Sequence, residues 1–255
     1  MVTIKTKEEI ASLREGGHRL AEILKILSAS VRPGISASEL NDLAVKLLKE
    51  SADTSAFLNY KPYGAKRPYP AVLCVSINDD VVHGIPNEVE KILKEGDVVS
   101  LDMGLVRKGL FTDMAVTVPV GVINDNAKKL LEITEKALAA GIAAARGGNR
   151  VGDISYAIES VIKPHGFGIV EELAGHGVGY AVHEDPYVPN YGKKNTGIIL
   201  KPGMVIAIEP MVNEGTKAVA LDSDGYTYKT KDGKRSAHFE KTIVITDGAA
   251  EILTQ

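Results

Sequence analysis

Apolar side chains recur at helical spacing through the first fifty residues of the chain. Thr6 and Glu9 form a capping-box pattern that predicts the start of a helix, and Pro33 with Gly34 predicts its end. A second helix is expected from Ser38, because four leucines follow it between residues 40 and 48 at the same spacing. The apolar positions of the first helix are Ile10, Leu13, Leu20, Ile23, Leu24 and Leu27. Two helices are therefore expected before any strand.

Short β-branched runs replace this periodicity from residue 71 onward. The predicted strands cover residues 71–77, 96–106, 109–120, 168–171, 204–208 and 238–245, with a turn at residues 107–109. Further helices are expected over residues 124–146 and 153–162. Residues 51–70 are rich in Pro, Gly and Tyr without periodicity, which is typical of a long loop that lines a site. Because no repeat or long polar linker interrupts these elements, the pattern predicts a single mixed α/β domain over residues 1–255.

Composition and charge narrow the class of protein. Hydrophobic residues make up 44% and charged residues 25% of the 255 residues, as in ordinary globular proteins. The net charge of −3 disfavours nucleic acid or an anionic bilayer as the main partner. Cys74 is the single cysteine, so an intramolecular disulfide or an all-cysteine zinc site is excluded, and a reducing compartment fits. With neither an apolar span nor a signal-peptide pattern visible, we expect a soluble, cytoplasmic protein and, by default, a monomer.

Acids and a histidine inside apolar, strand-like contexts are the candidate chemistry. Signatures such as G-x-S-x-G, H-E-x-x-H and G-x-x-x-x-G-K are absent. A single acid of this kind usually caps a strand end or pairs with a cation, but five such residues together favour a shared site. Four buried carboxylates repel one another unless multivalent cations lie between them, and two divalent ions offset their charge. An oxygen-rich donor set with one nitrogen suits Mn, Fe(II), Co or Zn, so the residues predict a binuclear hydrolase. The five residues are Asp102, Asp113, His176, Glu209 and Glu240.

Six segments, one around His83 and five around these residues, have an order and spacing typical of one family. They are INDDVVHGIP, SLDMG, FTDMA, GHGVGYAVHEDP, IEPM and SAHFEKTIVIT. Over nearly its whole length the chain resembles the short, bacterial type I methionine aminopeptidases, metallopeptidases with the pita-bread fold. This resemblance implies a curved antiparallel sheet flanked by helices, with a binuclear metal site at its centre.

The resemblance also implies a role for each site residue. The two metal ions would be held by Asp102, Asp113, His176, Glu209 and Glu240, with Asp113 and Glu240 bridging them. His183 would donate a hydrogen bond to the substrate carbonyl, His83 would lie near the scissile nitrogen, and Glu209 would assist proton transfer. Taken alone, either histidine would more often be a turn residue. The glycines around His176 lack the spacing of a phosphate-binding loop and are interpreted as points of close backbone approach.

The expected activity is removal of the initiator methionine from nascent polypeptides with a small second residue. The candidate walls of the methionine pocket are Phe57, Tyr60, Tyr63, Cys74 and Tyr226, and packing in the core is the competing interpretation for Phe57 and Cys74. Tyr226 stands where many relatives place a tryptophan, and the chain has no tryptophan. The basic residues 229–235 are interpreted as a solvated turn, with ribosome contact as the less favoured alternative.

Two alternative functions are weighed against this one. A proline-specific peptidase would need a large N-terminal domain, for which the 82 residues before His83 are too few. A non-catalytic binding homologue would typically lack metal ligands, whereas all five are present. The 26 positions from His183 to Glu209 leave no space for the helical insertion of type II aminopeptidases, so the short form is expected.

Overall fold

Two helices begin the chain in the computed structural model, which describes residues 2–255. Helix α1 (Lys7–Ser30) has the expected capping box, because Glu9 N–H donates to the Thr6 hydroxyl and Thr6 N–H donates to the Glu9 carboxylate. Helix α2 (Ala37–Ser51) begins earlier than predicted, because Ser36 is its N-cap and forms a second capping box with Glu39. The predicted start at Ser38 is therefore one residue late.

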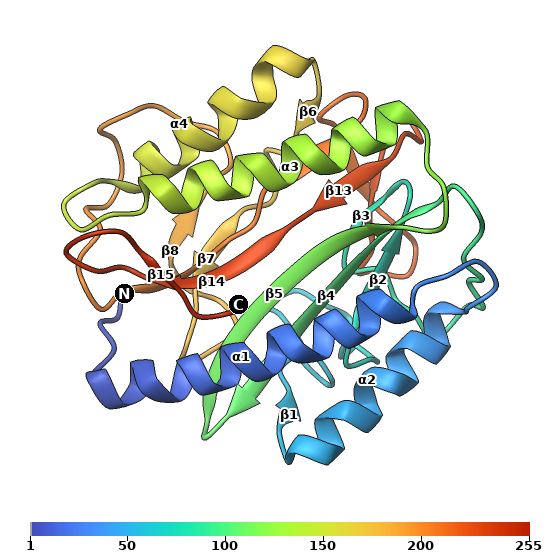
Figure 1. The fold of residues 1–255 in the computed structure, drawn as a ribbon, viewed down its shortest axis with the longest axis horizontal. Helices are drawn as coiled ribbons and strands as arrows, with labels where there is room; N and C mark the ends of the chain where they lie inside the picture. Colours follow the sequence, from blue (N-terminus) through green and yellow to red (C-terminus); the bar gives the residue numbers. More distant parts are fainter. Residues whose placement is uncertain (1) are drawn as a thin grey trace.

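Two further helices confirm the Ala-rich and apolar periodicity of the middle of the chain. Helix α3 (Asp125–Ala144) and helix α4 (Val151–Ile162) pack against each other, and a short 3₁₀ turn, η1 (Lys163–His165), follows α4. Figure 1 shows α1 and α3 lying across one face of the long, curved strands. Among residues 2–255, no helix combines the length and apolar content that crossing a membrane requires.

The main sheet has nine strands, and each of its strand pairs is antiparallel. Its continuous order is β1 (Thr54–Ser55), β4 (Val98–Arg107), β5 (Leu110–Pro119), β14 (Glu240–Val244), β9 (Val205–Ile208), β7 (Gly175–Gly177) and β8 (Glu184–Val188). Strand β2 (Cys74–Ile77) adds to β4, and β15 (Glu251–Ile252) adds to β14. A curved antiparallel sheet flanked by helices is thus the architecture that the sequence predicts.

Two three-stranded sheets complete the fold. One has the order β13 (Ser236–His238), β10 (Met211–Asn213) and β6 (Gly168–Ile169). The other has the order β11 (Val219–Leu221), β12 (Tyr228–Thr230) and β3 (Asp80–Val82). The prediction of one strand over residues 238–245 is wrong, because the chain leaves the ladder at Phe239, whose N–H donates to Pro210 O over 3.4 Å. The basic residues 229–235 are likewise not all turn, since they begin inside β12.

The apolar core lies between the helices and one face of the main sheet. Val99, Leu101, Met103 and Leu105 of β4 are buried in one cluster with side chains of α1 and α2. A second cluster lies between α3, α4 and the strands β9 and β14. Because side chains alternate across a strand, the other residues of β4, including Asp102, extend from the opposite face. That face is available for a site.

Candidate metal centre and pocket

Strand register brings three predicted site residues to the same face of the sheet. Asp102 on β4 lies opposite Ala115 on β5, and Ala115 lies opposite Glu240 on β14. Directly paired residues share a face, so Asp102 and Glu240 extend from the same side. Asp113 is two residues before Ala115 and therefore also extends from that side. The small Ala115 between the two acids leaves space for their side chains.

A second row of paired residues adds His176. His176 on β7 lies opposite Ala207 on β9, and Ala207 lies opposite Thr242 on β14. The Thr242 hydroxyl continues the row to β5, because it accepts from Asp113 N–H over 2.9 Å and donates to Asp113 O over 2.7 Å. The flanking Gly175 and Gly177 are needed for this packing, since a Cβ there would lie 2.3 Å from Ala207 O and 2.1 Å from Asp185 O. The interpretation of these glycines as points of close backbone approach is confirmed.

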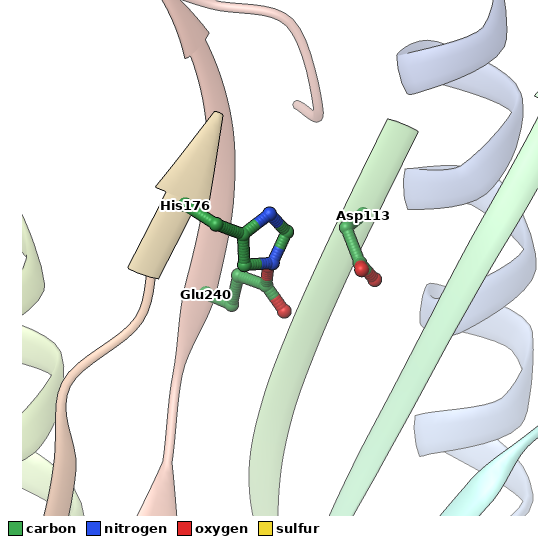
Figure 2. A group of neighbouring side chains, drawn as sticks. All are labelled: Asp113, His176 and Glu240. Atoms are coloured by element: carbon green, nitrogen blue, oxygen red, sulfur yellow. The ribbon is translucent and has the colours of Figure 1, made fainter. Parts of the chain in front are cut away.

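The side chains converge on the floor of a cavity of about 380 Å³. Asp113, His176 and Glu240 each offer one ligand atom, and these atoms lie within 4.8 Å of one another. Figure 2 shows the His176 ring and the two carboxylates pointing toward a common centre from β7, β5 and β14. Glu209 directly follows β9, and its Oε1 lies 3.3 Å from His176 Nε2. Asp102 lines the same cavity, so all five predicted ligands are brought together.

The protonation of His176 provides a test of whether a cation fits. His176 Nδ1 lies 2.9 Å from Gly177 O, and a carbonyl oxygen only accepts, so Nδ1 has the proton. Nε2 then has a lone pair, yet it faces Glu209 Oε1 at 3.3 Å. When Glu209 is ionised, two acceptors face each other and a cation between them stabilises the pair, and a fixed Nδ1–H is typical of a metal-ligating histidine. Asp102 Oδ1 and Glu240 Oε1 are also buried without a hydrogen-bond partner. The donor set therefore fits divalent metal.

Burial perturbs the pKa of every member of this cluster. Desolvation raises the pKa of Asp113 to about 7. Desolvation, followed by repulsion from neighbouring carboxylates, raises the pKa of Asp102, Glu209 and Glu240 well above their ordinary values. Burial lowers the pKa of His176 to about 3, so its imidazole is neutral. A divalent cation would stabilise the ionised form of these buried carboxylates, and the neutral imidazole has a lone pair to offer it.

The two predicted donor histidines lie beside this cluster. His83 directly follows β3, with φ at +59°, a left-handed conformation that is uncommon for a non-glycine residue and is frequent at functional sites. Burial lowers the pKa of His83 to about 4. His183 directly precedes β8; its ring centroid lies 4.5 Å from that of His176, and its Nδ1 lies 2.9 Å from the Tyr60 hydroxyl. Both histidines line the cavity.

Most of the predicted pocket residues form an apolar wall. Phe57, Cys74 and Tyr226 are buried in one cluster, with Tyr60 packed against it. Thus core packing and pocket lining are not alternatives for Cys74 and Phe57, because the same cluster borders the cavity. Tyr63 also borders the cavity but is fully exposed (108%), so the structure places it at the rim.

Tyr69 and His238 are among the cavity residues that the sequence does not single out. Tyr69 packs edge-on against Tyr226, with ring centroids 5.2 Å apart, and donates its hydroxyl to Gly84 O. It lies in an irregular loop, where spacing gives no signal. His238 is two residues before Glu240, and period-two alternation could have placed both side chains on one face. Its Nε2 lies 3.5 Å from Glu209 Oε2.

Comparison with known proteins agrees with this fold and site. Residues 11–247 match the Metallopeptidase family M24, and the chain belongs to this family. Methionine aminopeptidase 1 of Bacillus subtilis is 43% identical over 255 residues, covering 100% of both chains. The methionine aminopeptidase of Aquifex aeolicus is 45% identical over 258 residues, covering 100% of this chain and 99% of the relative.

Solved structures give the same assignment of the fold. The methionine aminopeptidase of Thermotoga maritima superposes with a TM-score of 0.94 at 42% identity, covering 100% of each chain. The prolidase of Pyrococcus horikoshii gives a TM-score of 0.76 at 23% identity, covering 99% of this chain and 63% of the other, and this likeness concerns the fold alone. The architecture is the single-domain pita-bread fold of the M24 family.

Proposed function

We propose that the protein is a metal-dependent aminopeptidase that removes N-terminal methionine from polypeptides with a small second residue. The observation that supports this most directly is the convergence of five candidate metal ligands, three of them with ligand atoms within 4.8 Å of one another, in a cavity with an apolar wall. The full-length similarity to methionine aminopeptidases gives the reaction and the substrate class. The proline-specific and non-catalytic alternatives are not favoured.

Two divalent ions, chosen among Mn, Fe(II), Co and Zn, are the proposed cofactors. Asp102, Asp113, His176, Glu209 and Glu240 would hold them, with Asp113 and Glu240 shared. When bound, such ions lower the pKa of water toward neutrality and polarise a carbonyl. Asp113 and Glu240 are suited to sharing, because their strands, β5 and β14, lie between the strand of Asp102 (β4) and the strand of His176 (β7).

The chain's own residues supply the proton transfers and the hydrogen bonds. Glu209 takes a proton from the attacking water, since its carboxylate faces the cavity next to His176. The Tyr60 hydroxyl lies 2.9 Å from His183 Nδ1. By donating to Nδ1 it would leave the ring proton on Nε2 as a donor to the substrate carbonyl. His83 faces the scissile nitrogen, and its lowered pKa keeps the ring neutral at pH 7.

Substrate selection follows from the two ends of the cavity. An acid such as Asp102 binds the free α-amine, so a blocked N-terminus is not accepted. The wall of Phe57, Cys74 and Tyr226 contacts the first side chain, and a polarizable thioether packs well beside aromatic edges and sulfur. Tyr60 borders this wall, and Tyr63 lies at the rim where the rest of the peptide leaves.

The proposed partners are the N-termini of nascent polypeptides, met by a monomeric enzyme in the cytoplasm. Residues 229–235 offer little support for ribosome contact, because two of their cations are already paired. Lys229 Nζ lies 3.4 Å from Asp80 Oδ1, and Arg235 Nε lies 2.8 Å from Glu214 Oε2. We propose that residues 1–255 act as one domain.

An assay of purified protein on Met-Ala-Ser and on N-acetyl-Met-Ala-Ser tests the function. Free alanyl-serine should be released from the first peptide only, chelation should abolish the release, and Mn²⁺, Fe²⁺ or Co²⁺ should restore it. Full activity after exhaustive chelation would exclude the metallopeptidase function. A preference for proline at the second position with any first residue would instead favour a proline peptidase.

A further inference from the structure

His238 is a buried side chain with polar atoms that find no partner. It ends β13, is 2% exposed, and neither ring nitrogen has a hydrogen bond within residues 2–255. An unpaired N–H in the interior is destabilising, so a buried histidine in this state calls for a function or a nearby acceptor. The nearest acids are Glu209, whose Oε2 lies 3.5 Å from Nε2, and Glu240, whose Oε2 lies 4.0 Å away.

Its surroundings differ from those of His176 in a way that separates two roles. A metal-ligating histidine nearly always donates its second ring N–H to a fixed acceptor. His176 Nδ1 has such an acceptor in Gly177 O at 2.9 Å, whereas His238 Nδ1 has none among the described residues. The geometry therefore fits His238 as a donor to a ligand better than as a ligand itself.

The Glu209 carboxylate lies between these two imidazoles. Its Oε1 is 3.3 Å from His176 Nε2, and its Oε2 is 3.5 Å from His238 Nε2. Its backbone is fixed separately, because Asn190 Nδ2 donates to Glu209 O over 3.0 Å. Rotation of the carboxylate would exchange the two oxygens between the two imidazoles. A donor on one side restricts that rotation.

We propose that His238 is a positioning residue that donates from Nε2 to Glu209 Oε2 and so directs Glu209 Oε1 to the metal beside His176. The contact reaches ordinary hydrogen-bond length with a contraction of about 0.5 Å. This inference rests on the proposed metal-dependent function. It adds a residue of the three-stranded sheet β13-β10-β6 to a metal centre whose five candidate ligands lie on or directly beside strands of the main sheet.

Three substitutions at one position separate a donor from a space-filling side chain. Glutamine places an amide N–H near the position of Nε2, asparagine is too short to reach Glu209, and leucine fills the space without a donor. His238→Gln should keep Mn²⁺ affinity within about 3-fold of wild type. His238→Leu and His238→Asn should weaken it by roughly 10–100-fold, as loss of such a supporting donor typically does. His165→Gln, at an exposed histidine of η1, is the matched control and should change nothing.

For each variant, chelator competition measures the Mn²⁺ affinity and the number of ions bound. A separate assay measures kcat and KM on Met-Ala-Ser. Because His238→Leu removes a buried polar group, His238→Asn keeps the comparison decisive if the leucine variant does not fold. Equal Mn²⁺ affinity in the asparagine and glutamine variants would overturn the proposal. Loss of one bound ion in all three variants would also overturn it, by making His238 a ligand. A wild-type protein that binds Mn²⁺ but does not cleave Met-Ala-Ser would instead refute the proposed function, and the affinities would still decide the role of His238.

Discussion

Glu240→Gln distinguishes a metal ligand from a structural carboxylate. Replacing a structural carboxylate should destabilise the metal-free protein, whereas replacing a metal ligand should leave the stability of the metal-free protein nearly unchanged. Glu240 is buried among like-charged groups, and burial with their repulsion raises its pKa well above the ordinary value. The metal-free side chain is therefore protonated more readily than an ordinary glutamate, and its protonated form is similar in size and charge to glutamine. Its Oε1 makes no hydrogen bond that the substitution could remove. We expect the free energy of unfolding of the metal-free variant to stay within about 1 kcal/mol of wild type.

The metal-dependent part of the stability should be lost in this variant. At 100 times the dissociation constant, a bound ion stabilises the folded state by about 2.7 kcal/mol. For a chain of this size that corresponds to a rise in Tm of roughly 5–10 °C. A 100-fold weaker site would leave only about 0.4 kcal/mol at the same Mn²⁺ concentration, a rise of roughly 1–2 °C. Thermal scans with and without Mn²⁺, on wild type and variant, measure both quantities.

Glu184→Gln is the matched control, since Glu184 is a buried carboxylate with a structural partner. Its Oε2 lies 2.7 Å from Lys5 Nζ, and the two side chains are 8% and 1% exposed. Although burial alone would raise the pKa of Glu184, hydrogen bonds from Lys5 and Thr3 keep it below its ordinary value, so it is ionised. Removing it leaves Lys5 uncompensated and should cost about 3 kcal/mol with or without Mn²⁺. If Glu240→Gln behaved like this control, with an unchanged response to Mn²⁺, Glu240 would not be a ligand.

Three further outcomes are expected. His83→Ala and His183→Ala should each lower kcat by roughly 10²-fold with metal content unchanged, since each removes one transition-state donor. Tyr60→Phe should cost only about 1 kcal/mol of transition-state stabilisation, since it removes one hydrogen bond to His183. Metal loss in a histidine variant would contradict this assignment. In metal-free protein the pKa of Asp113, raised by burial to about 7, exceeds its ordinary 3.8, so the folded state binds more protons. In urea unfolding, the stability of the wild type relative to Asp113→Asn should therefore fall as pH rises from about 4 to 8, and a rise of that difference over the window would refute the reasoning. Met-Ala-Ser should exceed Met-Leu-Ser in kcat/KM by about 10²-fold, because a bulky second residue displaces the carbonyl by ~1 Å, and equal values would point to a broad aminopeptidase.

The sequence predicts the long elements and some short ones, such as β2, β6 and β9, but misses others. Helices α1 to α4 and strands β4 and β5 span many periods of their pattern, so local spacing suffices to find them. Strands such as β3, β7 and β10 have three residues each, too few for an alternation to be visible. Their existence depends on partners far away in the chain, which no local window contains.

The candidate site is predicted for a different reason. Acids in apolar surroundings are conspicuous because burying them is costly, and this identified the five candidate ligands without any knowledge of pairing. Their convergence depends on register, such as Ala115 between Asp102 and Glu240, which the sequence does not specify locally. Tyr63 was expected in the pocket wall because its loop has no periodicity from which exposure could be inferred. His238 was passed over because its role depends on its distance to Glu209.

The departure of the chain from the sheet at Phe239 restricts how this segment can change during evolution. Residues 236–238 pair in one sheet and residues 240–244 in another, so both registers are counted along a single continuous stretch. Inserting or deleting one residue there would invert every side chain in one of the two sheets. The irregular loop of residues 56–73 has no such double constraint and can vary in length. Divergent relatives should therefore differ in the loop that borders the first side chain of the substrate, while the spacing between His238 and Glu240 stays fixed.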